Sequence, residues 1–305
     1  MEEDILCLKS LTKMFGNRAC VSEVNMNIKK GDIYGFIGRN GAGKTTTLKM
    51  IVGLTEPTSG EITLFGSDNL NNGRHNTGTV IESPAFVPHL SARDNMYIQW
   101  RLLDSKNENI IDETLEMVGL KGVGNKKAKD FSLGMKQRLG IGMALMGEPE
   151  FLVLDEPVNG LDPEGIISVR SLLKKLNEEK GVTILISSHL LNELSRLATR
   201  YGIINNGKMV DEFSLSELDE RCESHLEVKV DDLKKAESLI KGAFSEVNIK
   251  VVPVKNIIEI YGFTGKPGDL TKVLAINDIL VESIRKSSVD LEDYFMKAIG
   301  GESNG

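Results

Sequence analysis

The chain has 305 residues, of which 40% are apolar and 5% aromatic, and its formal net charge is −7. A nucleic-acid-binding protein would usually carry a basic surface, so the acidic balance argues against that class of partner. No run approaches the roughly 20 apolar residues that cross a bilayer, and the acidic start of the chain lacks the basic region of a signal peptide. We therefore expect a cytoplasmic chain of about two domains.

The first informative element is a glycine-rich loop between a predicted strand at 33–37 and a predicted helix at 45–54. Residues 38–45, GRNGAGKT, fit the pattern G-x-x-x-x-G-K-[ST] of a phosphate-binding loop. Its glycines let backbone N–H groups point at phosphate oxygens, and the helix start adds a partial positive charge. We expect Lys44 to reach the β- and γ-phosphates and the Thr45 hydroxyl to ligate Mg²⁺. The residues expected to bind the nucleotide here are Gly38, Asn40, Gly41, Ala42, Gly43, Lys44, Thr45 and Thr46.

Strands and helices alternate after this loop. Ser91 is followed three residues later by Asp94, which predicts a capping box at the start of a helix. The alternation predicts an α/β domain that has a parallel sheet and a helical insertion. The predicted strands lie at 61–65, 77–81, 151–154 and 182–186, and the predicted helical segments lie between 86 and 147 and at 163–177.

Two carboxylates follow the apolar run at 151–154. Such a run is typical of a strand in a parallel sheet that is buried on both faces. Asp155 and Glu156 then fall at its carboxyl end, where open α/β sheets bind ligands. Because adjacent strand residues project to opposite sides, we expect one carboxylate to orient water around Mg²⁺ and the other to face an attacking water. Taken alone, the pair also fits a strand end exposed to solvent, and the phosphate-binding loop favours the functional interpretation.

The chain changes character after a predicted strand and turn at 201–210, and the polar segment 214–221 that follows is predicted to be a helical link. The order strand, helix, strand, strand, helix, strand predicts a small α+β domain of ferredoxin-like arrangement. No residue in it has catalytic spacing, so we interpret its charges as a solvated face. The predicted elements lie at 226–230, 232–242, 247–252, 257–261, 268–277 and 279–285, followed by a helix at 291–299 and a disordered tail at 300–305.

Five motifs together resemble the nucleotide-binding subunit of an ABC transporter, over residues 4 to about 215. They are Walker A at 38–45, a signature sequence SLGMK at 132–136, Walker B at 151–156, a D-loop NGLD at 159–162 and the switch histidine His189. The resemblance implies a P-loop NTPase cassette at 1–215 with a helical subdomain at about 86–150, and leaves 222–300 as an accessory domain. Phe15 falls where the family has an aromatic that stacks on adenine, and a buried Phe at a strand end is the alternative.

The resemblance also implies roles for the residues of the Walker B strand and its neighbour. Glu156 would act as general base, and Asp155 would hold Mg²⁺ through water. His189 would touch the γ-phosphate and hold the attacking water and the base in place. The reaction implied is hydrolysis of ATP to ADP and phosphate with Mg²⁺ as cofactor.

In the family, each ATP lies between two subunits arranged head to tail. Ser132 and Gly134 would approach the γ-phosphate bound by the opposite chain, and Asp162 would cross the interface. The second chain would be an identical copy or a related subunit. Leu133 and Met135 depart from the family's signature, which has Gly and Gln there. This departure leaves the rate of ATP hydrolysis open. Integral membrane permease subunits would be separate chains, which would place this chain on the inner face of the cell membrane.

The sharpest departure from the family is Glu82, where Gln is usual. With the following SPAF at 83–86 it resembles the E-loop of the bacitracin-resistance and lantibiotic-immunity exporters. A carboxylate binds Mg²⁺ more strongly than an amide does, but donates no hydrogen bond unless protonated. Glu82 is thus a candidate catalytic residue and metal ligand. The alternative is a surface Glu after the strand, with the register shifted by one or two residues.

Two function classes follow from these motifs. The first is an ATPase subunit that powers export of an antimicrobial peptide, lantibiotic or bacitracin-like, or of a drug or unrelated substrate. The second is a soluble ABC ATPase without a transport role. Ribosomal relatives usually carry two cassettes and repair relatives carry coiled-coil or zinc insertions, whereas this chain has one cassette and neither insertion. A GTPase is disfavoured because NKKA at 125–128 lacks the Asp of the base-reading motif.

Overall fold

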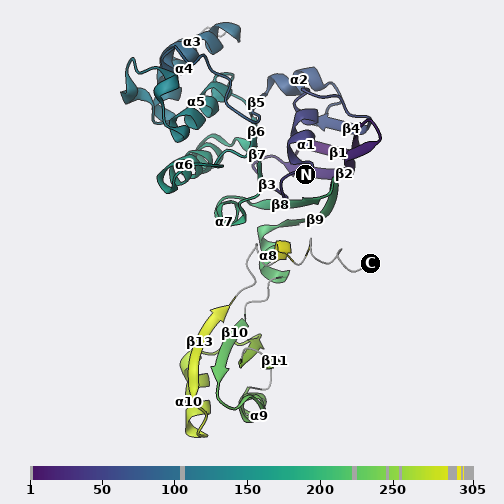
Figure 1. Cartoon of the computed structure of the whole chain (residues 1–305), viewed down its shortest axis with the longest axis vertical. Helices are drawn as coiled ribbons and strands as arrows, with labels where there is room; N and C mark the ends of the chain where they lie inside the picture. The colour runs from purple at the N-terminus through teal and green to yellow at the C-terminus, as the bar shows by residue number, and fades with distance from the viewer. Residues whose placement is uncertain are drawn as a thin grey trace. The chain divides into compact units, whose positions relative to one another are not determined.

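The computed structural model divides the chain into two compact units, Met1–Leu215 and Ser216–Gly305 (Figure 1). Within the described residues, no helix is both long enough and apolar enough to span a bilayer. The predicted tail at 300–305 and most of the predicted helix at 291–299 fall outside the description. The structure describes residues 3–103, 107–221, 225–244, 247–253, 256–287, 294–296 and 298.

The first unit contains a six-stranded sheet with the order β5-β6-β7-β3-β8-β9. The pairs from β5 to β8 are parallel, and β9 is antiparallel to β8. Every residue of β3, β6 and β7 is buried, as expected for central strands covered on both faces. The strands are β3 (Ile33–Ile37), β5 (Thr77–Val80), β6 (Phe151–Asp155), β7 (Thr183–Ser188), β8 (Arg200–Asn205) and β9 (Lys208–Ser214).

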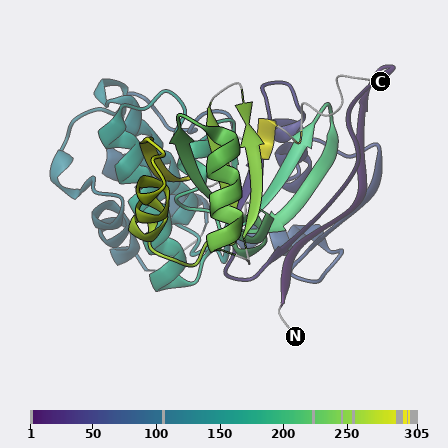
Figure 2. The ribbon, with the colours of Figure 1, turned by 90° about the horizontal axis from the view of Figure 1, so that it is seen from below.

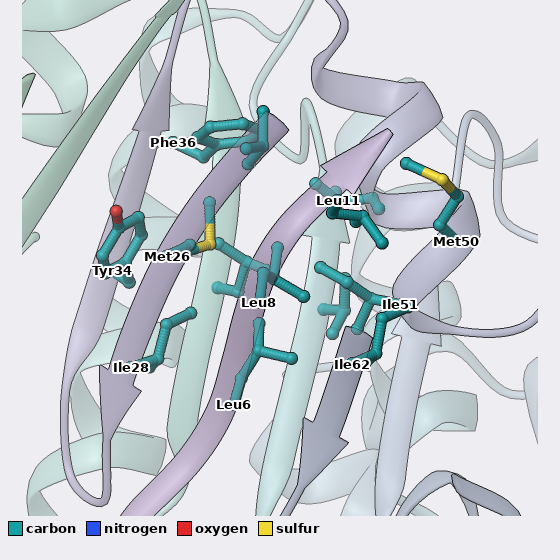
Figure 3. Packing of buried hydrophobic residues seen from close by; sticks show 14 of the residues in the cluster. Leu6, Leu8, Leu11, Met26, Ile28, Tyr34, Phe36, Met50, Ile51 and Ile62 are labelled. Atoms are coloured by element: carbon teal, nitrogen blue, oxygen red, sulfur yellow. The ribbon is translucent and has the colours of Figure 1, made fainter. Parts of the chain in front are cut away.

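A second, antiparallel sheet of the first unit has the order β2-β1-β4. Its strands are β1 (Asp4–Phe15), β2 (Arg18–Lys29) and β4 (Ser59–Leu64). The first two form a long twisted hairpin, coloured purple in Figure 2. Apolar side chains of this sheet, of β3 and of the helix α1 (Lys44–Ile51) share one core, which Figure 3 shows around Leu8, Phe36 and Ile51. This core fixes the helix that follows the phosphate-binding loop.

Helices α3, α4 and α5 pack together beside the six-stranded sheet (Figure 1). The capping box predicted at Ser91 is confirmed, because its hydroxyl accepts from the Asp94 N–H while Asp94 accepts from the Ser91 N–H. The Ser91 hydroxyl also donates to Oδ2 of Asp94 at 2.7 Å, and this bond, followed by the one from the Ser91 N–H, holds the pKa of Asp94 below its ordinary value. The helices of this unit are α2 (Leu70–His75), α3 (Ala92–Leu102), α4 (Asn109–Met117), α5 (Leu133–Leu145), α6 (Pro163–Lys180) and α7 (Leu191–Leu194).

The second unit has its own sheet, of order β11-β12-β10-β13, with all pairs antiparallel. Side chains of α9 and α10 share one apolar core with the sheet, for example Ile240 and Leu270 against Ile258. The order of strands and helices is the one expected from the sequence. The elements are α8 (Leu215–Arg221), β10 (His225–Val230), α9 (Leu233–Ala243), β11 (Asn248–Val252), β12 (Ile257–Tyr261), α10 (Pro267–Ile276) and β13 (Val281–Ser287).

Candidate active site at the carboxyl edge of the six-stranded sheet

The glycine-rich loop at 38–43 connects β3 to α1 and has little room for side chains. A Cβ on Gly38 would lie 2.6 Å from the carbonyl oxygen of Ile204, and one on Gly43 would lie 2.8 Å from that of Cys20. Gly43 also has a φ of 110°, a conformation that L side chains rarely adopt. Gly38 is required because a side chain would clash with a neighbouring carbonyl oxygen. Gly43 is required for the same reason and also because of its backbone conformation. Asn40 is exposed at the tip of the loop, and Ala42 is buried beneath it.

Lys44 at the start of α1 lies between the loop and the Walker B carboxylate. Its ammonium donates to the carbonyl oxygen of Gly38 at 2.7 Å and lies 3.2 Å from Oε1 of Glu156. Only 5% of its side chain is exposed. A buried ammonium beside a glycine-rich loop and a helix start is suited to bind phosphate oxygens. The structure therefore brings together two motifs that lie more than a hundred residues apart.

Asp155 is held by hydroxyl groups from two neighbouring elements. The Thr45 hydroxyl donates to its Oδ2 at 2.8 Å, and the Ser187 hydroxyl donates to its Oδ1. The carboxylate is buried at the end of β6. A carboxylate and a threonine hydroxyl are hard oxygen donors, so this set fits Mg²⁺ and does not suit a soft metal. Thr46, the next residue of α1, is half-buried.

Glu156 leaves the end of β6 with its backbone in the left-handed region, at a φ of 50°. Such a conformation costs a non-glycine residue roughly 1–3 kcal/mol and is concentrated at functional sites. The Glu156 N–H donates to the Ser187 hydroxyl at 3.0 Å, and this bond helps to hold the conformation. Oε2 of Glu156 lies 2.8 Å from Nδ1 of His189, which follows the end of β7. The carboxylate therefore contacts a lysine through one oxygen and a histidine through the other.

Glu82 lies just beyond β5, also with a positive φ, 60°. The Ser83 N–H donates to the carbonyl oxygen of Ile81 at 2.7 Å, which closes a tight three-residue turn around Glu82. Its Oε1 lies 2.6 Å from Nζ of Lys49, and 63% of its side chain is exposed. Lys49 is four residues after Thr45 on α1 and hence on the same helix face. The structure thus places Glu82 beside Lys49, a residue of α1 that follows Thr45 by one helical turn.

The signature and D-loop residues form the starts of two neighbouring helices. The Ser132 hydroxyl accepts from the N–H of Met135 at the start of α5, and Asp162 accepts from the N–H of Gly165 at the start of α6. A Cβ on Gly134 would lie 3.6 Å from the Cα of Gly165, so the two helix starts approach closely. Among the described residues, no hydrogen bond or ion pair joins these caps to the glycine-rich loop of the same chain.

Phe15 is exposed at the end of β1, with 54% of its surface accessible. The alternative of a buried Phe at a strand end is therefore wrong. The ammonium of Lys13 lies 5.1 Å from the centre of the ring, and also donates to the carbonyl oxygen of Glu56. An exposed aromatic ring whose position is partly fixed by a neighbouring cation is suited to stack on a planar base.

Sequence reasoning missed three residues that contact the predicted ones, namely Lys13, Lys49 and Ser187. A signal for Ser187 was present, because Asp155 and Ser187 end adjacent parallel strands and are paired in register. Parallel strands that end at one edge bring their last residues together. Lys49 had no local signal, since its contact depends on the turn beyond β5.

The second unit contains another group of residues that could hold a metal ion. His225, Glu227 and Glu259 offer ligand atoms within 4.8 Å of one another. Both carboxylates are already paired with cations, Glu227 with Arg285 and Glu259 with Lys250. These pairs follow the strand register, so cross-strand ion pairing accounts for the cluster.

Comparison with known protein families and curated sequences gives consistent matches. The model of the family described as ABC transporter matches residues 21–159. The bacitracin transport ATP-binding protein BcrA of Bacillus licheniformis is 44% identical over 304 residues, covering 99% of each chain. The lantibiotic transport ATP-binding protein SrtF of Streptococcus pyogenes is 43% identical over 206 residues, covering 68% of this chain and 89% of that protein.

Solved structures match the first unit. A dimeric ATP-binding cassette in a post-hydrolysis state, bound to ADP and Pi, has a TM-score of 0.61 and 29% identity, and the match covers 69% of this chain and 98% of the cassette. A structure of the ATP-binding subunit of an ABC transporter has a TM-score of 0.63, also at 29% identity, covering 71% of this chain and 92% of that one.

Proposed function

The chain belongs to the ATP-binding proteins of ABC transporters, and we propose that the transport it drives is export of a peptide antibiotic of the bacitracin or lantibiotic type. As an ABC ATPase, it hydrolyses ATP to drive transport. The observation that carries the proposed substrate class is the 44% identity to a bacitracin transport ATP-binding protein over 99% of both chains. The identity to a lantibiotic transport protein supports the same branch, as does Glu82 at the E-loop position.

We propose that residues 1–215 are the nucleotide-binding domain, with a helical subdomain at about 86–150, and that 222–300 form an accessory domain. A ferredoxin-like assignment of the accessory domain is supported by the strand order β11-β12-β10-β13 and by its antiparallel pairing. The shared core of both helices with the sheet also agrees with that arrangement.

In the proposed reaction, the oxygen of a water molecule attacks the γ-phosphorus of ATP, and the bond from that phosphorus to the bridging oxygen breaks to release ADP. Glu156 accepts a proton from the water, and His189, 2.8 Å from that carboxylate, holds it in place. Lys44 contacts the β- and γ-phosphates, and Phe15 stacks on the adenine. The backbone strain at Glu156 supports this assignment, because it fixes the carboxylate in a direction that a regular strand end would not give.

We propose that Thr45, Asp155 and Glu82 hold Mg²⁺, with Asp155 acting through water. The contact between the Thr45 hydroxyl and the Asp155 carboxylate at the end of β6 supports the first two. Bound Mg²⁺ would neutralise charge on the phosphate oxygens. Mg²⁺ suits this site because the Asp155 carboxylate and the Thr45 hydroxyl are hard oxygen donors.

The caps at the helix starts support a site made by two chains. Ser132 and Gly134 open α5, and a helix start favours an anion such as the γ-phosphate. We propose that they contact the ATP bound by a second chain, identical or related, and that Asp162 crosses the interface. The matching cassettes of known structure include dimers.

We propose that permease subunits bind beside Glu82 and hold the chain on the inner face of the membrane. A cavity of about 320 Å³ opens next to this residue. Its walls include Pro84 from the segment after β5, Leu103 from the end of α3 and Gly140 from α5. A partner segment seated there would contact both the E-loop and the helix that begins with the signature sequence.

The test is co-expression of the chain with candidate permease subunits in a bacitracin- or lantibiotic-sensitive host. We expect the chain to co-purify with the membrane subunits and to raise the tolerated antibiotic concentration. Glu156→Gln should retain co-purification and abolish protection. Failure to associate with any membrane subunit would support the soluble ATPase alternative. Association without protection would support an exporter of another substrate.

A further inference from the structure

Lys49 is a charged residue of α1 that the proposed mechanism does not use. Its Nζ lies 2.6 Å from Oε1 of Glu82, and 31% of its side chain is exposed. Lys49 and Thr45 share a face of α1, one turn apart, and Thr45 contacts Asp155. Lys49 therefore links Glu82 to the face of α1 that carries Thr45, a proposed Mg²⁺ ligand.

The backbone conformation of Glu82 also favours its contact with Lys49. Its φ of 60° and the hydrogen bond from the N–H of Ser83 to the oxygen of Ile81 form a strained turn. The turn directs the Glu82 side chain toward α1, where it forms an ion pair with Lys49. A backbone conformation that is unfavourable for glutamate is thus combined with a specific cation partner.

We propose that Lys49 is a positioning residue that competes with Mg²⁺ for the carboxylate of Glu82. This inference rests on the proposed role of Glu82 as a metal ligand. The carboxylate of Glu82 lies 2.6 Å from the ammonium of Lys49. If Glu82 ligates Mg²⁺ as proposed, its carboxylate must leave that ammonium or be shared with it, because both cations would use the same oxygens. Lys49 therefore sets the Mg²⁺ concentration at which the nucleotide binds in its metal-bound form.

The side chain of lysine suits this role. Its ammonium is a compact charge on a flexible stem, so the pair can separate without moving the helix. Because both side chains are partly exposed, the pair is weak enough for a divalent cation to break it. A buried pair such as Lys44 with Glu156 would not exchange so readily.

The experiment compares Lys49→Met with Glu82→Gln and with the double variant. The readout is binding of a fluorescent ATP analogue as a function of Mg²⁺ concentration, together with direct Mn²⁺ binding followed by electron paramagnetic resonance. Lys174→Met is the matched control, because it too removes a helix lysine that pairs with a glutamate. Lys174 lies on α6, and its Nζ is 3.6 Å from Oε1 of Glu178. Lys49→Arg keeps the charge and should change the cation dependence less than Lys49→Met does. Thermal unfolding of each variant reports any general loss of stability.

We expect Lys49→Met to lower the cation concentration for half-maximal binding about two- to fivefold, the size expected for a partly exposed charge pair. The shift should vanish when Glu82→Gln is already present. An equal shift in both backgrounds, or no shift at all in Lys49→Met, would overturn the role of Lys49. If Glu82→Gln alone leaves the cation dependence unchanged, Glu82 is not a ligand and the inference is overturned with it. Antibiotic protection by the wild type is a separate readout, so none of these results decides the proposed transport function.

Discussion

Carboxylates in the two units of the chain are both held by cations, but in different ways. In the second unit, Glu227 and Glu259 pair with lysine and arginine side chains directly across an antiparallel sheet of regular register. In the first unit, Glu156 leaves its strand in a strained conformation and contacts a lysine from the glycine-rich loop. Regular pairs of this kind stabilise a sheet, whereas strain combined with partners from distant motifs indicates chemistry.

The largest effect that tests this comparison is Glu156→Gln. An amide does not accept the proton of the attacking water, so we expect phosphate release to fall at least about 100-fold while ATP binding is retained. Glu178→Gln, an exposed change on α6, is the control and should leave the rate unchanged. Phosphate release by Glu156→Gln within tenfold of the wild type would show that another group is the base.

Lys44→Ala should weaken ATP binding about 30-fold or more. The buried ammonium of Lys44 is the group proposed to contact the β- and γ-phosphates, and a hydrogen bond to a charged group contributes about 1.5–3 kcal/mol. Titration of a fluorescent ATP analogue measures the affinity. Lys175→Ala on the exposed face of α6 should bind as the wild type does. An affinity of Lys44→Ala close to that of the wild type would contradict the placement of the phosphates.

A substitution in the core of the second unit tests whether the stability of that unit affects ATP hydrolysis in the first. Ile258 is completely buried between the four-stranded sheet and its helices, so Ile258→Ala should lower the free energy of unfolding of this unit by about 2–5 kcal/mol. ATP hydrolysis at 25 °C should remain within about twofold of the wild type, because the site lies wholly in the first unit. Calorimetry and phosphate release measure the two quantities.

The control for that change is Ile276→Ala, since Ile276 is 71% exposed and its loss should cost less than about 0.5 kcal/mol. A fall in ATP hydrolysis by Ile258→Ala that matches its fall in stability would show that the second unit supports the site.

The smallest effect concerns alkaline pH. Burial, and then the neighbouring carboxylate of Glu212, raise the pKa of Tyr34 well above its ordinary value. In the unfolded chain tyrosine loses its proton near pH 10, while folded Tyr34 keeps it, so the free energy of unfolding falls as pH rises past about 10. In Tyr34→Phe, the free energy of unfolding measured with urea should fall less steeply between pH 9 and 11 than in the wild type. An identical slope for both proteins would contradict this assignment.

Local pattern was sufficient to predict much of the site. The glycine-rich loop, Asp155 with Glu156, and His189 each follow a buried strand of a parallel sheet, and such strands end at one edge. Their position at one edge of the sheet could therefore be predicted before their contacts were known. The helix cap at Ser91 was equally local and is confirmed.

Other features depend on tertiary structure and escaped prediction. The long hairpin of β1 and β2 contains several register shifts, which interrupt the alternation that would have indicated strands. The exposure of Phe15 and its contact with Lys13 depend on where that hairpin ends. The pair of Lys49 and Glu82 requires a turn with positive φ at a glutamate, which sequence propensity does not favour.

The most direct test of the account is the mass of Glu156→Gln in solution, measured by light scattering with and without Mg-ATP. In the part of the chain that the structure describes, no hydrogen bond or ion pair links Ser132 to the glycine-rich loop, so we expect each ATP to be bound by two chains. We expect Glu156→Gln to be a monomer without ATP and a dimer with saturating ATP. Adding Ser132→Arg should prevent the dimer although ATP still binds. A Glu156→Gln chain that binds ATP and stays monomeric would contradict this expectation.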